Sequence, residues 1–481
     1  MSASMYASTP DVRDVPSREK VLVIGAGPAG LAAGAALKAV GIPFDIADAH
    51  HDVGGIWSGA ADAPVWPGMR PISSREGTQF EDLVMPASFP AFPSPEQLSK
   101  YLRAYAARHD LTEHFLPGTT VRSAVPFEDF VWQVELSSGV VSVYRAVIVA
   151  TGTSARPHLP AWAQGAAPAG TRIIHARDWA GAEGLEGRTV LVVGSGQSAA
   201  DIAVDAAARA LEVRWSVRTG HWIVPRTIAG TPGDVAAARE PALLGALNVK
   251  IAEAVVRRTA GSPQSVGLPA PAAPLLEDRV IVSDDVIPRI REGRIRPVAD
   301  VASLREDGTV ELVDGTDWNP SVIVLATGYE SGVDDLLHGI VPTTDSGAPD
   351  LFLGAFPRGR DDLAVLGQVR VAGGIWPLLA QQADVTALFW RAVLDGAPAA
   401  EDFRRARRGS DSAVPVQHAP RRDGSVRGRL AAGMDRLQDA TRRSASPRRV
   451  DESGQLPFAD REDLMARLRS VRALLEGTAR R

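Results

Sequence analysis

Apolar residues recur along the chain as short runs that end in glycine. The run "VLVIG" (21–25) precedes an alanine-rich helix pattern that ends near Gly41, and the run "FDIAD" (44–48) follows. Short continuous apolar runs are typical of parallel strands covered on both faces, and strands that alternate with helices indicate an α/β fold. The run "RTVLVVG" (188–194) opens a second unit of the same order. The pattern therefore predicts two strand–turn–helix units.

Three further segments have patterns that predict secondary structure. Residues 94–109 begin with Ser94 and place Gln97 three positions later, which predicts a helix that starts with a capping box. Residues 131–152 and 307–329 each predict a hairpin followed by a buried strand that ends in "ATG".

The second unit contains another recognisable strand. Its sequence "LEVRWSVRTG" alternates apolar and polar residues from Leu211 to Val217, which predicts a strand whose apolar side chains share one face. The proline-rich stretch 157–170 predicts a crossing between domains. Residues 228–277 have no clear pattern.

After about residue 400 arginine predominates and the apolar spacing decays. The stretch 404–429, which begins "RRARRGSDS", predicts a mobile, solvated tail. Residues 461–477 regain an apolar spacing and predict one more amphipathic helix.

Composition excludes several classes of protein. The chain has 481 residues, of which 45% are hydrophobic and 23% charged, as in ordinary globular proteins of two to four domains. The net charge of −5 gives no basic field for nucleic acid. The absence of cysteine excludes disulfides, thiolate metal sites and the redox-active disulfide of the disulfide reductases. Neither a signal peptide nor a membrane span is recognisable, so we expect a cytoplasmic protein.

The first glycine turn has the features of a dinucleotide site. Gly25 permits a tight turn, Gly27 admits the pyrophosphate, and Gly30 lets the helix pack closely on the strand. The N-terminus of the helix then offers free N–H groups to the phosphates. Asp48, at the end of the second strand, can accept hydrogen bonds from a ribose diol.

The second glycine turn differs at the end of its second strand. Gly194, Gly196 and Ala199 take the same three positions as the first turn's glycines. Arg218 stands where an acidic residue would bind an unphosphorylated ribose, and its planar fork suits a 2′-phosphate. This pattern favours NADPH, with a surface arginine as the alternative.

Two dinucleotide sites in one chain suggest a relay in which NADPH gives hydride to a flavin. "ATG" at 150–152 and at 326–328 ends a strand with a small residue and glycine, which lets the chain pass close to a cofactor. No Ser-His-Asp triad and no cluster of metal ligands is evident in the sequence.

An ordered set of motifs now resembles a known family. The chain is similar to the flavin-containing monooxygenases and to the neighbouring Baeyer–Villiger monooxygenases over roughly residues 20–395. The motifs are "GAGPAG" (25–30), "GGIW" (54–57), "GSGQSAADIA" (194–203), "ATGY" (326–329) and "GGIWPLLAQQ" (373–382).

The resemblance implies an α/β fold with two Rossmann-like dinucleotide-binding domains, the NADPH domain being inserted into the FAD domain. We expect these parts: a flexible leader at 1–17, the FAD domain at 18–165 and 326–400, the NADPH domain at 166–325, and an arginine-rich, partly disordered C-terminal region at 401–481.

The resemblance also assigns residues to the two cofactors, FAD and NADPH. For the first half of the chain these are Gly25, Gly27, Pro28, Ala29, Gly30, Asp48, Ala49, Gly55, Ile56, Trp57, Val121, Thr151 and Gly152. For the second half they are Gly194, Ser195, Gly196, Gln197, Ser198, Arg218, Thr219 and Gly328.

One departure from the family concerns catalysis. In the family a flavin hydroperoxide, shielded by NADP+, carries the oxygen, and a dry pocket prolongs its life. Its usual polar partner is an asparagine, or an aspartate in the Baeyer–Villiger branch, but "RPISSREG" has Ile72 there. Ser73, Arg70 and Gln368 are the candidate catalytic substitutes.

The family signature before the second unit is also incomplete. In "AGTRIIHARDW", His175 and Trp179 fit the signature, whereas Ala169 and Thr171 do not, and Ala180 replaces the usual proline or aspartate. Trp179, at the last position of the signature, favours the Baeyer–Villiger branch. For His175, a direct role and a histidine satisfied by backbone remain equally open.

The resemblance implies an NADPH- and O2-dependent monooxygenase that oxygenates nitrogen or sulfur of a small molecule through a flavin hydroperoxide. Baeyer–Villiger oxidation of a ketone, an NADPH oxidase or reductase that releases peroxide, and a redox-sensing binding protein are the alternatives. Monomer and dimer both remain open. Four tryptophans could line a substrate pocket or pack in cores: Trp57, Trp66, Trp222 and Trp376.

Overall fold

The structure is a computed structural model of the whole chain. It describes residues 16–165, 167–168, 170–238, 245–275, 279–344, 348–409, 456 and 458–479. Most of the expected leader, most of the expected tail, and Ala169 of the family signature lie outside the described residues.

The first sheet has five parallel strands in the order β24-β7-β1-β2-β3. The strands are β1 (Val21–Ile24), β2 (Phe44–Ala47), β3 (Phe115–Leu116), β7 (Ala146–Val149) and β24 (Leu363–Val365). Helix α1 (Pro28–Ala39) packs between this sheet and the long helix α9 (Trp376–Leu394). The four residues of β1 are all buried, as a parallel strand covered on both faces requires.

The second sheet repeats this plan in the order β16-β11-β10-β20-β9, again with parallel neighbours. The strands are β9 (Arg172–His175), β10 (Thr189–Val193), β11 (Glu212–Ser216), β16 (Ile295–Val298) and β20 (Val322–Leu325). Helices α4 (Gln197–Ala206) and α7 (Val286–Arg291) pack on it. The predicted α/β class with parallel sheets is therefore correct.

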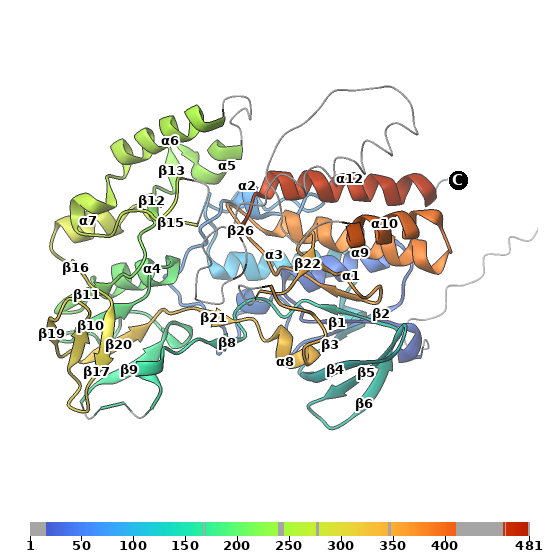
Figure 1. Cartoon of the computed structure of the whole chain (residues 1–481), viewed down its shortest axis with the longest axis horizontal. Helices are drawn as coiled ribbons and strands as arrows, with labels where there is room; N and C mark the ends of the chain where they lie inside the picture. The colour runs from blue at the N-terminus through green and yellow to red at the C-terminus, as the bar shows by residue number, and fades with distance from the viewer. Residues whose placement is uncertain are drawn as a thin grey trace, which may run out of the picture.

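The second sheet lies in sequence between β7 and β24 of the first. Two connecting segments, β8 (Arg156–Pro157) and β21 (Tyr329–Glu330), pair antiparallel where the chain leaves and re-enters the first unit. Figure 1 shows them between the two sheets, which stand side by side. The proline-rich crossing predicted at 157–170 begins at this pair.

Smaller antiparallel sheets form from the predicted hairpins. They comprise β4 (Val121–Glu128), β5 (Val131–Leu136) and β6 (Val141–Tyr144) on one side, and β17 (Val301–Leu304), β18 (Val310–Leu312) and β19 (Asp317–Trp318) on the other. Helix α3 (Pro95–Arg108) starts with the predicted capping box, in which Ser94 and Gln97 exchange hydrogen bonds. Among the described residues, no helix combines the length and apolar character needed to cross a membrane.

The stretch without a clear sequence pattern folds into short elements beside the second sheet. They are β13 (Thr227–Ile228), β14 (Thr231–Pro232), α5 (Gly233–Ala238) and α6 (Gly245–Thr259), with β12 (Trp222–Val224) before the stretch and β15 (Val280–Val282) after it. The remaining elements are α2 (Arg75–Thr78), α8 (Val333–Leu337), β22 (Leu351–Phe352), β23 (Phe356–Pro357), β25 (Arg370–Val371), α10 (Pro398–Gly409), β26 (Phe458–Ala459) and α12 (Arg461–Ala479).

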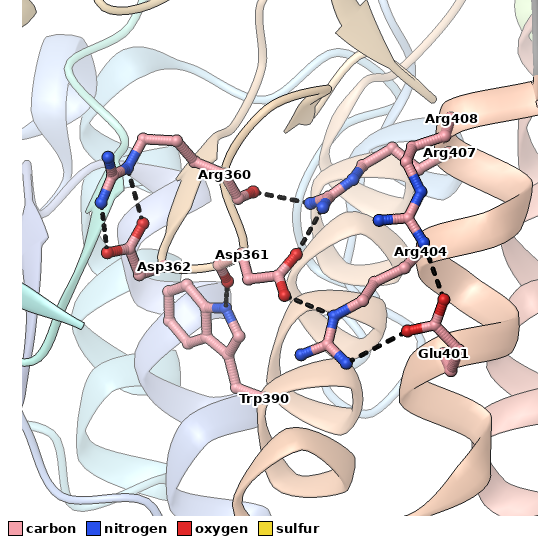
Figure 2. Close-up of polar contacts among 8 residues, drawn as sticks. All are labelled: Arg360, Asp361, Asp362, Trp390, Glu401, Arg404, Arg407 and Arg408. Atoms are coloured by element: carbon pink, nitrogen blue, oxygen red, sulfur yellow. Dashed lines mark hydrogen bonds and ion pairs between the residues drawn. The ribbon is translucent and has the colours of Figure 1, made fainter. Parts of the chain in front are cut away.

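A charged network holds α10 against the loop before β24 (Figure 2). Asp361 accepts from Arg404 Nε at 2.5 Å and from Arg407, while its carbonyl accepts Trp390 Nε1 at 2.6 Å. Arg407 is only 3% exposed and also donates to the carbonyl of Arg360 at 2.6 Å. A buried cation needs such partners because an unpaired charge is costly away from water.

Helix α10 corrects one expectation. The tail predicted to begin at residue 404 is wrong for its first residues, because Arg404–Gly409 belong to α10. The fully buried Phe403 anchors the helix, a signal that the surrounding arginines obscured. The predicted C-terminal helix is confirmed as α12, which packs on α9.

One side chain of the alternating strand also differs from expectation. Val213, Trp215 and Val217 are buried, but Leu211 is 68% exposed. The strand β11 begins only at Glu212, so Leu211 lies beyond the end of the sheet, where nothing covers the apolar face.

Candidate functional site: two glycine turns and the loops between them

The first glycine turn connects β1 to α1 in a conformation that requires glycine. Gly25 has φ of +107°, and a Cβ there would lie 2.5 Å from the carbonyl oxygen of Ala150. A Cβ on Gly30 would lie 1.8 Å from the carbonyl oxygen of Gly25. The backbone is therefore packed against the "ATG" segment on one side and against its own helix on the other.

Asp48 fixes this turn from the end of β2. Its Oδ2 accepts the backbone N–H of Ala26 at 2.6 Å, and its Oδ1 accepts the backbone N–H of His50 at 2.8 Å. The residue is 9% exposed, and each carboxylate oxygen keeps a further lone pair. The next residue, Ala49, is exposed.

The "GGIW" segment lies directly against the first turn. A Cβ on Gly55 would come within 3.0 Å of the Cα of Gly27, so the two backbones touch. On its other side is a cavity of about 330 Å³ beside α3. Its lining includes Ile56, Trp57, Trp66, Pro67, Lys100 and Arg103.

The second glycine turn repeats the first. Gly194 has φ of +140°, and a Cβ there would lie 2.2 Å from the carbonyl oxygen of Ala326. Gly25 meets Ala150 in the same way, so each turn lies against the first residue of an "ATG" segment. The position of a Cβ on Gly196 is open apart from a guanidinium nitrogen of Arg279 at 4.0 Å.

Two side chains of the second turn already form hydrogen bonds with backbone groups. Ser195 Oγ accepts the backbone N–H groups of Arg218 and Thr219 at 3.2 and 3.1 Å, which leaves its hydroxyl proton to donate. The amide of Gln197 pairs with the backbone of Val282 on β15. Arg218 is exposed, and its guanidinium forms no ion pair with the residues that the structure describes.

Both helices that follow the turns present unpaired N–H groups. The backbone nitrogens of Ala29 and Gly30 in α1, and of Ser198 and Ala199 in α4, have no hydrogen-bond acceptor within the described parts of the chain. Pro28 occupies the first turn of α1, where a missing N–H is harmless. Each turn thus fits the pyrophosphate of a dinucleotide.

The two "ATG" segments carry different contacts. Thr151 and Gly152 are exposed, and the Gly152 carbonyl accepts Nε2 of the buried Gln368 at 3.2 Å. Gln368 Oε1 is buried and has no hydrogen-bond partner among the described residues. An unsatisfied buried amide oxygen costs free energy, so an incoming donor would be favoured there.

His175 is held by backbone groups. Its Nε2 donates to the carbonyl of Gly328 at 3.1 Å, and its Nδ1 accepts the backbone N–H of Arg177 at 3.1 Å. Burial lowers the pKa of His175 below its usual value, which favours this neutral tautomer. Of the two interpretations of His175, the histidine satisfied by backbone is the one observed.

The three candidate catalytic substitutes form separate hydrogen bonds in the described structure. Ser73 Oγ lies 2.7 Å from Thr78 Oγ1, and Arg70 is exposed with a single hydrogen bond to the carbonyl of Met69. Neither residue is hydrogen bonded to Gln368 in the described structure. Ile72, between Arg70 and Ser73, is 41% exposed.

Other expected residues have mainly structural surroundings. Val121 starts β4 and packs against the buried apolar cluster that includes Trp132 and Val147. Trp222 and Trp376 pack in cores, so the packing interpretation is correct for both. Trp57 and Trp66 line the 330 Å³ cavity, and both also contact apolar cores, with Trp66 only 4% exposed. Trp179 is buried and donates to Asp205 at 2.9 Å.

Two residues of the site were missed by sequence reasoning. Arg226 and Asp234 bind the Pro71–Ser74 segment from the second unit. Asp234 falls in the stretch without a clear pattern (228–277), and Arg226 lies two residues before it. The signal that could have found them is the "AG" dipeptide between them, which suits a tight hairpin.

Comparison with known proteins gives a consistent family. A model described as flavin-binding monooxygenase-like matches residues 18–402. The N-oxide-forming dimethylaniline monooxygenase 2 of Rattus norvegicus is 30% identical over 392 residues, which are 76% of this chain and 72% of that protein. A probable indole-3-pyruvate monooxygenase of Arabidopsis thaliana is 28% identical over 374 residues, 73% and 82% of the two chains.

Solved structures share the fold at lower identity. The flavin-containing monooxygenase of Stenotrophomonas maltophilia matches with a TM-score of 0.59 at 21% identity, over 78% of this chain and 98% of that one. An open crystal structure of cyclohexanone monooxygenase matches with a TM-score of 0.64 at 18% identity, over 96% and 97% of the two chains.

Proposed function

Because the chain belongs to the flavin-binding monooxygenase-like family and is an oxidoreductase with FAD and NADPH as cofactors, we propose that it oxygenates nitrogen or sulfur of a small molecule. The proposal draws the nitrogen part of its substrate class from relatives named N-oxide-forming, which are 30% identical to this chain. When bound, FAD supplies hydride transfer from NADPH and the activation of O2.

The observation that carries this proposal is the duplicated glycine turn. Gly25 packs on Ala150, and Gly194 packs on Ala326, in two sheets of the same parallel plan. We assign FAD to the first turn, because Asp48 ends its second strand, and NADPH to the second. The NADPH domain is then an insertion in the FAD domain.

In the first unit the chain would bind and orient FAD. The N–H groups of Ala29 and Gly30 would bind the pyrophosphate, and Asp48, already fixed by two backbone N–H groups, would accept the ribose hydroxyls. The exposed Thr151 and Gly152 leave room for the cofactor beside Gln368, whose Oε1 would accept a donor.

In the second unit two cations surround the turn. Arg218 would pair with the 2′-phosphate of NADPH, since its guanidinium makes no ion pair with the described residues. Arg279, near Gly196, adds positive charge beside the pyrophosphate. The hydroxyl of Ser195 keeps its proton for a phosphate oxygen.

Product analysis tests the proposal. The protein is incubated with NADPH, O2 and separate substrates (a tertiary amine, a thioether and a cyclic ketone), and products are identified by mass spectrometry. We expect one added oxygen on the amine or the thioether. Oxygen added to the ketone alone would replace this proposal with Baeyer–Villiger chemistry.

A second candidate, an NADPH oxidase that releases peroxide, is favoured by one observation. Ile72 offers no hydrogen bond and is 41% exposed, so water has access to that part of the loop. Consumption of NADPH with equal release of hydrogen peroxide, and no oxygenated product from any substrate, would support this candidate.

A further inference from the structure

The Pro71–Ser74 segment of the first unit is gripped at both ends by the second unit. Arg226 Nη1 donates to the carbonyl of Pro71 at 2.7 Å. Asp234 Oδ2 accepts both the backbone N–H and the hydroxyl of Ser74, at 2.7 and 3.0 Å. Ile72 and Ser73 are the two residues between the gripped positions.

Arg226 and Asp234 are brought together by a tight hairpin. They flank β13 and β14, which pair through the two-residue turn Ala229–Gly230. Both turn residues have positive φ, +50° and +81°, which matches the type I′ turn of two-residue hairpins. Gly233 N–H also donates to the Arg226 carbonyl at 2.9 Å, so the base of the hairpin is closed.

The hairpin is in turn fixed to the second glycine turn. Gln197, at the start of α4, pairs with Val282 on β15, and β15 pairs with β12, which ends two residues before Arg226. The backbone N–H of Arg226 donates to Asp284 at 3.0 Å, and its guanidinium lies 5.4 Å from the ring centroid of Phe92. The position of the hairpin is therefore set by the same elements that form the second turn.

Gly77, three residues after the gripped segment, packs against Gly374, six residues after Gln368. A Cβ on Gly374 would lie 2.0 Å from the carbonyl oxygen of Gly77, and one on Gly373 would lie 3.5 Å from the Asp234 Cβ. The C-terminal segment closes this contact from the far side, because Arg461 Nε donates to the Gly374 carbonyl at 2.8 Å. Asp234 thus binds Ser74 on one side and lies next to Gly373 on the other.

We propose that Arg226 and Asp234 are positioning residues that hold the Pro71–Ser74 loop of the first unit in register with the second glycine turn. The catalytic consequence, tighter coupling of NADPH oxidation to oxygenation, rests on the proposed function. The positioning itself does not, because it depends only on contacts within the chain.

The test uses the full chain and two kinds of measurement. Arg226→Met removes one grip, Asp234→Asn takes the negative charge from the acceptor of the other, and Arg226→Lys keeps a donor for the Pro71 carbonyl. Asp285→Asn is the matched control, because this exposed carboxylate of the same unit makes no hydrogen bond with the described residues. Hydrogen exchange is followed by mass spectrometry in a peptide that spans residues 69–79.

We expect Arg226→Met and Asp234→Asn to speed exchange of this peptide about tenfold, the effect of losing one charge-assisted hydrogen bond. The control and Arg226→Lys should exchange nearly as the wild type does. Unchanged exchange in both Arg226→Met and Asp234→Asn would overturn the proposal.

The second measurement is the peroxide released per NADPH consumed, together with KM for NADPH. We expect the peroxide fraction to rise about twofold or more in Arg226→Met and Asp234→Asn, while KM stays within about twofold of the wild-type value, because nucleotide binding is left intact. Faster exchange with an unchanged peroxide fraction would overturn the catalytic consequence. A wild type that oxidises no NADPH would refute the proposed function. Hydrogen exchange of the 69–79 peptide would then be the measurement that tests whether Arg226 and Asp234 position the loop.

Discussion

Oδ2 of Asp48 lies 2.6 Å from the backbone nitrogen of Ala26 and so ties the end of β2 to the first glycine turn. Oδ1 accepts a second backbone N–H, from His50. Both oxygens therefore act as acceptors before any ligand arrives, and the carboxylate is oriented in advance for the ribose that we assign to it. A preorganised group loses little conformational freedom on binding.

Asp48→Asn should weaken FAD binding. The amide replaces one acceptor by an NH2 group that faces a backbone N–H, and losing a hydrogen bond to a charged group costs about 1.5–3 kcal/mol. The dissociation constant of FAD for the apoprotein, measured by quenching of flavin fluorescence, should rise roughly ten- to a hundredfold. Asp62→Asn, a change at an exposed carboxylate nearby, should leave it unchanged. If Asp48→Asn binds FAD as tightly as the wild type does, the assignment of FAD to the first turn is wrong.

Arg218→Ala should reduce the use of NADPH and spare NADH. The lost pair with the 2′-phosphate corresponds to about 1.5–3 kcal/mol, so kcat/KM for NADPH should fall roughly ten- to a hundredfold. Initial rates with both nucleotides check this. A loss of the same size with NADH would mean that Arg218 only supports the strand end. Arg209→Ala, a change at an exposed ion pair of the same unit, is the control.

Ile72→Asn should lower peroxide release. A hydrogen bond at a developing oxyanion is worth about 3–4 kcal/mol, and the wild-type side chain offers none. Because Ile72 is 41% exposed, the new amide stays in contact with water and its burial adds little cost. The peroxide formed per NADPH consumed, without substrate, should be substantial in the wild type and lower in Ile72→Asn. Negligible peroxide from the wild type would show that other groups already replace the missing polar partner.

Asp361→Ala should destabilise the protein strongly. It leaves the buried Arg407 without its carboxylate, and breaking a buried ion pair costs about 3–5 kcal/mol. Asp402→Ala removes a partly exposed carboxylate that pairs with the exposed Arg405 on the same helix and should cost at most about 1 kcal/mol. Thermal unfolding followed by circular dichroism compares the two variants. Equal stability of the variants would mean that the network of Figure 2 contributes little.

The parts of the fold that sequence predicted well depend on local rules. Gly25 and Gly194 take positive φ that other residues avoid, so their positions mark both turns. Ser94 and Gln97 form a capping box within four residues of one another. Such features are determined by neighbours in the chain, and pattern reasoning finds them.

The parts that sequence missed depend on distant partners. Asp234 meets Ser74 across 160 residues, and Arg407 finds Asp361 across 46. Neither contact can be recognised from the local sequence. Asp234 lies in a stretch without a clear pattern, and Arg407 is one of several arginines close together. His175 was ambiguous for the same reason, because its partner is the carbonyl of Gly328.

The central claim is that FAD and NADPH occupy the two glycine turns and exchange hydride. Anaerobic titration of the purified, FAD-loaded protein tests it most directly, with the flavin absorbance near 450 nm, the usual flavin band, as the readout. We predict that about one equivalent of NADPH bleaches this band and that admitting O2 restores it. Protein that binds no FAD, or bound flavin that keeps its absorbance when NADPH is added, would contradict the account.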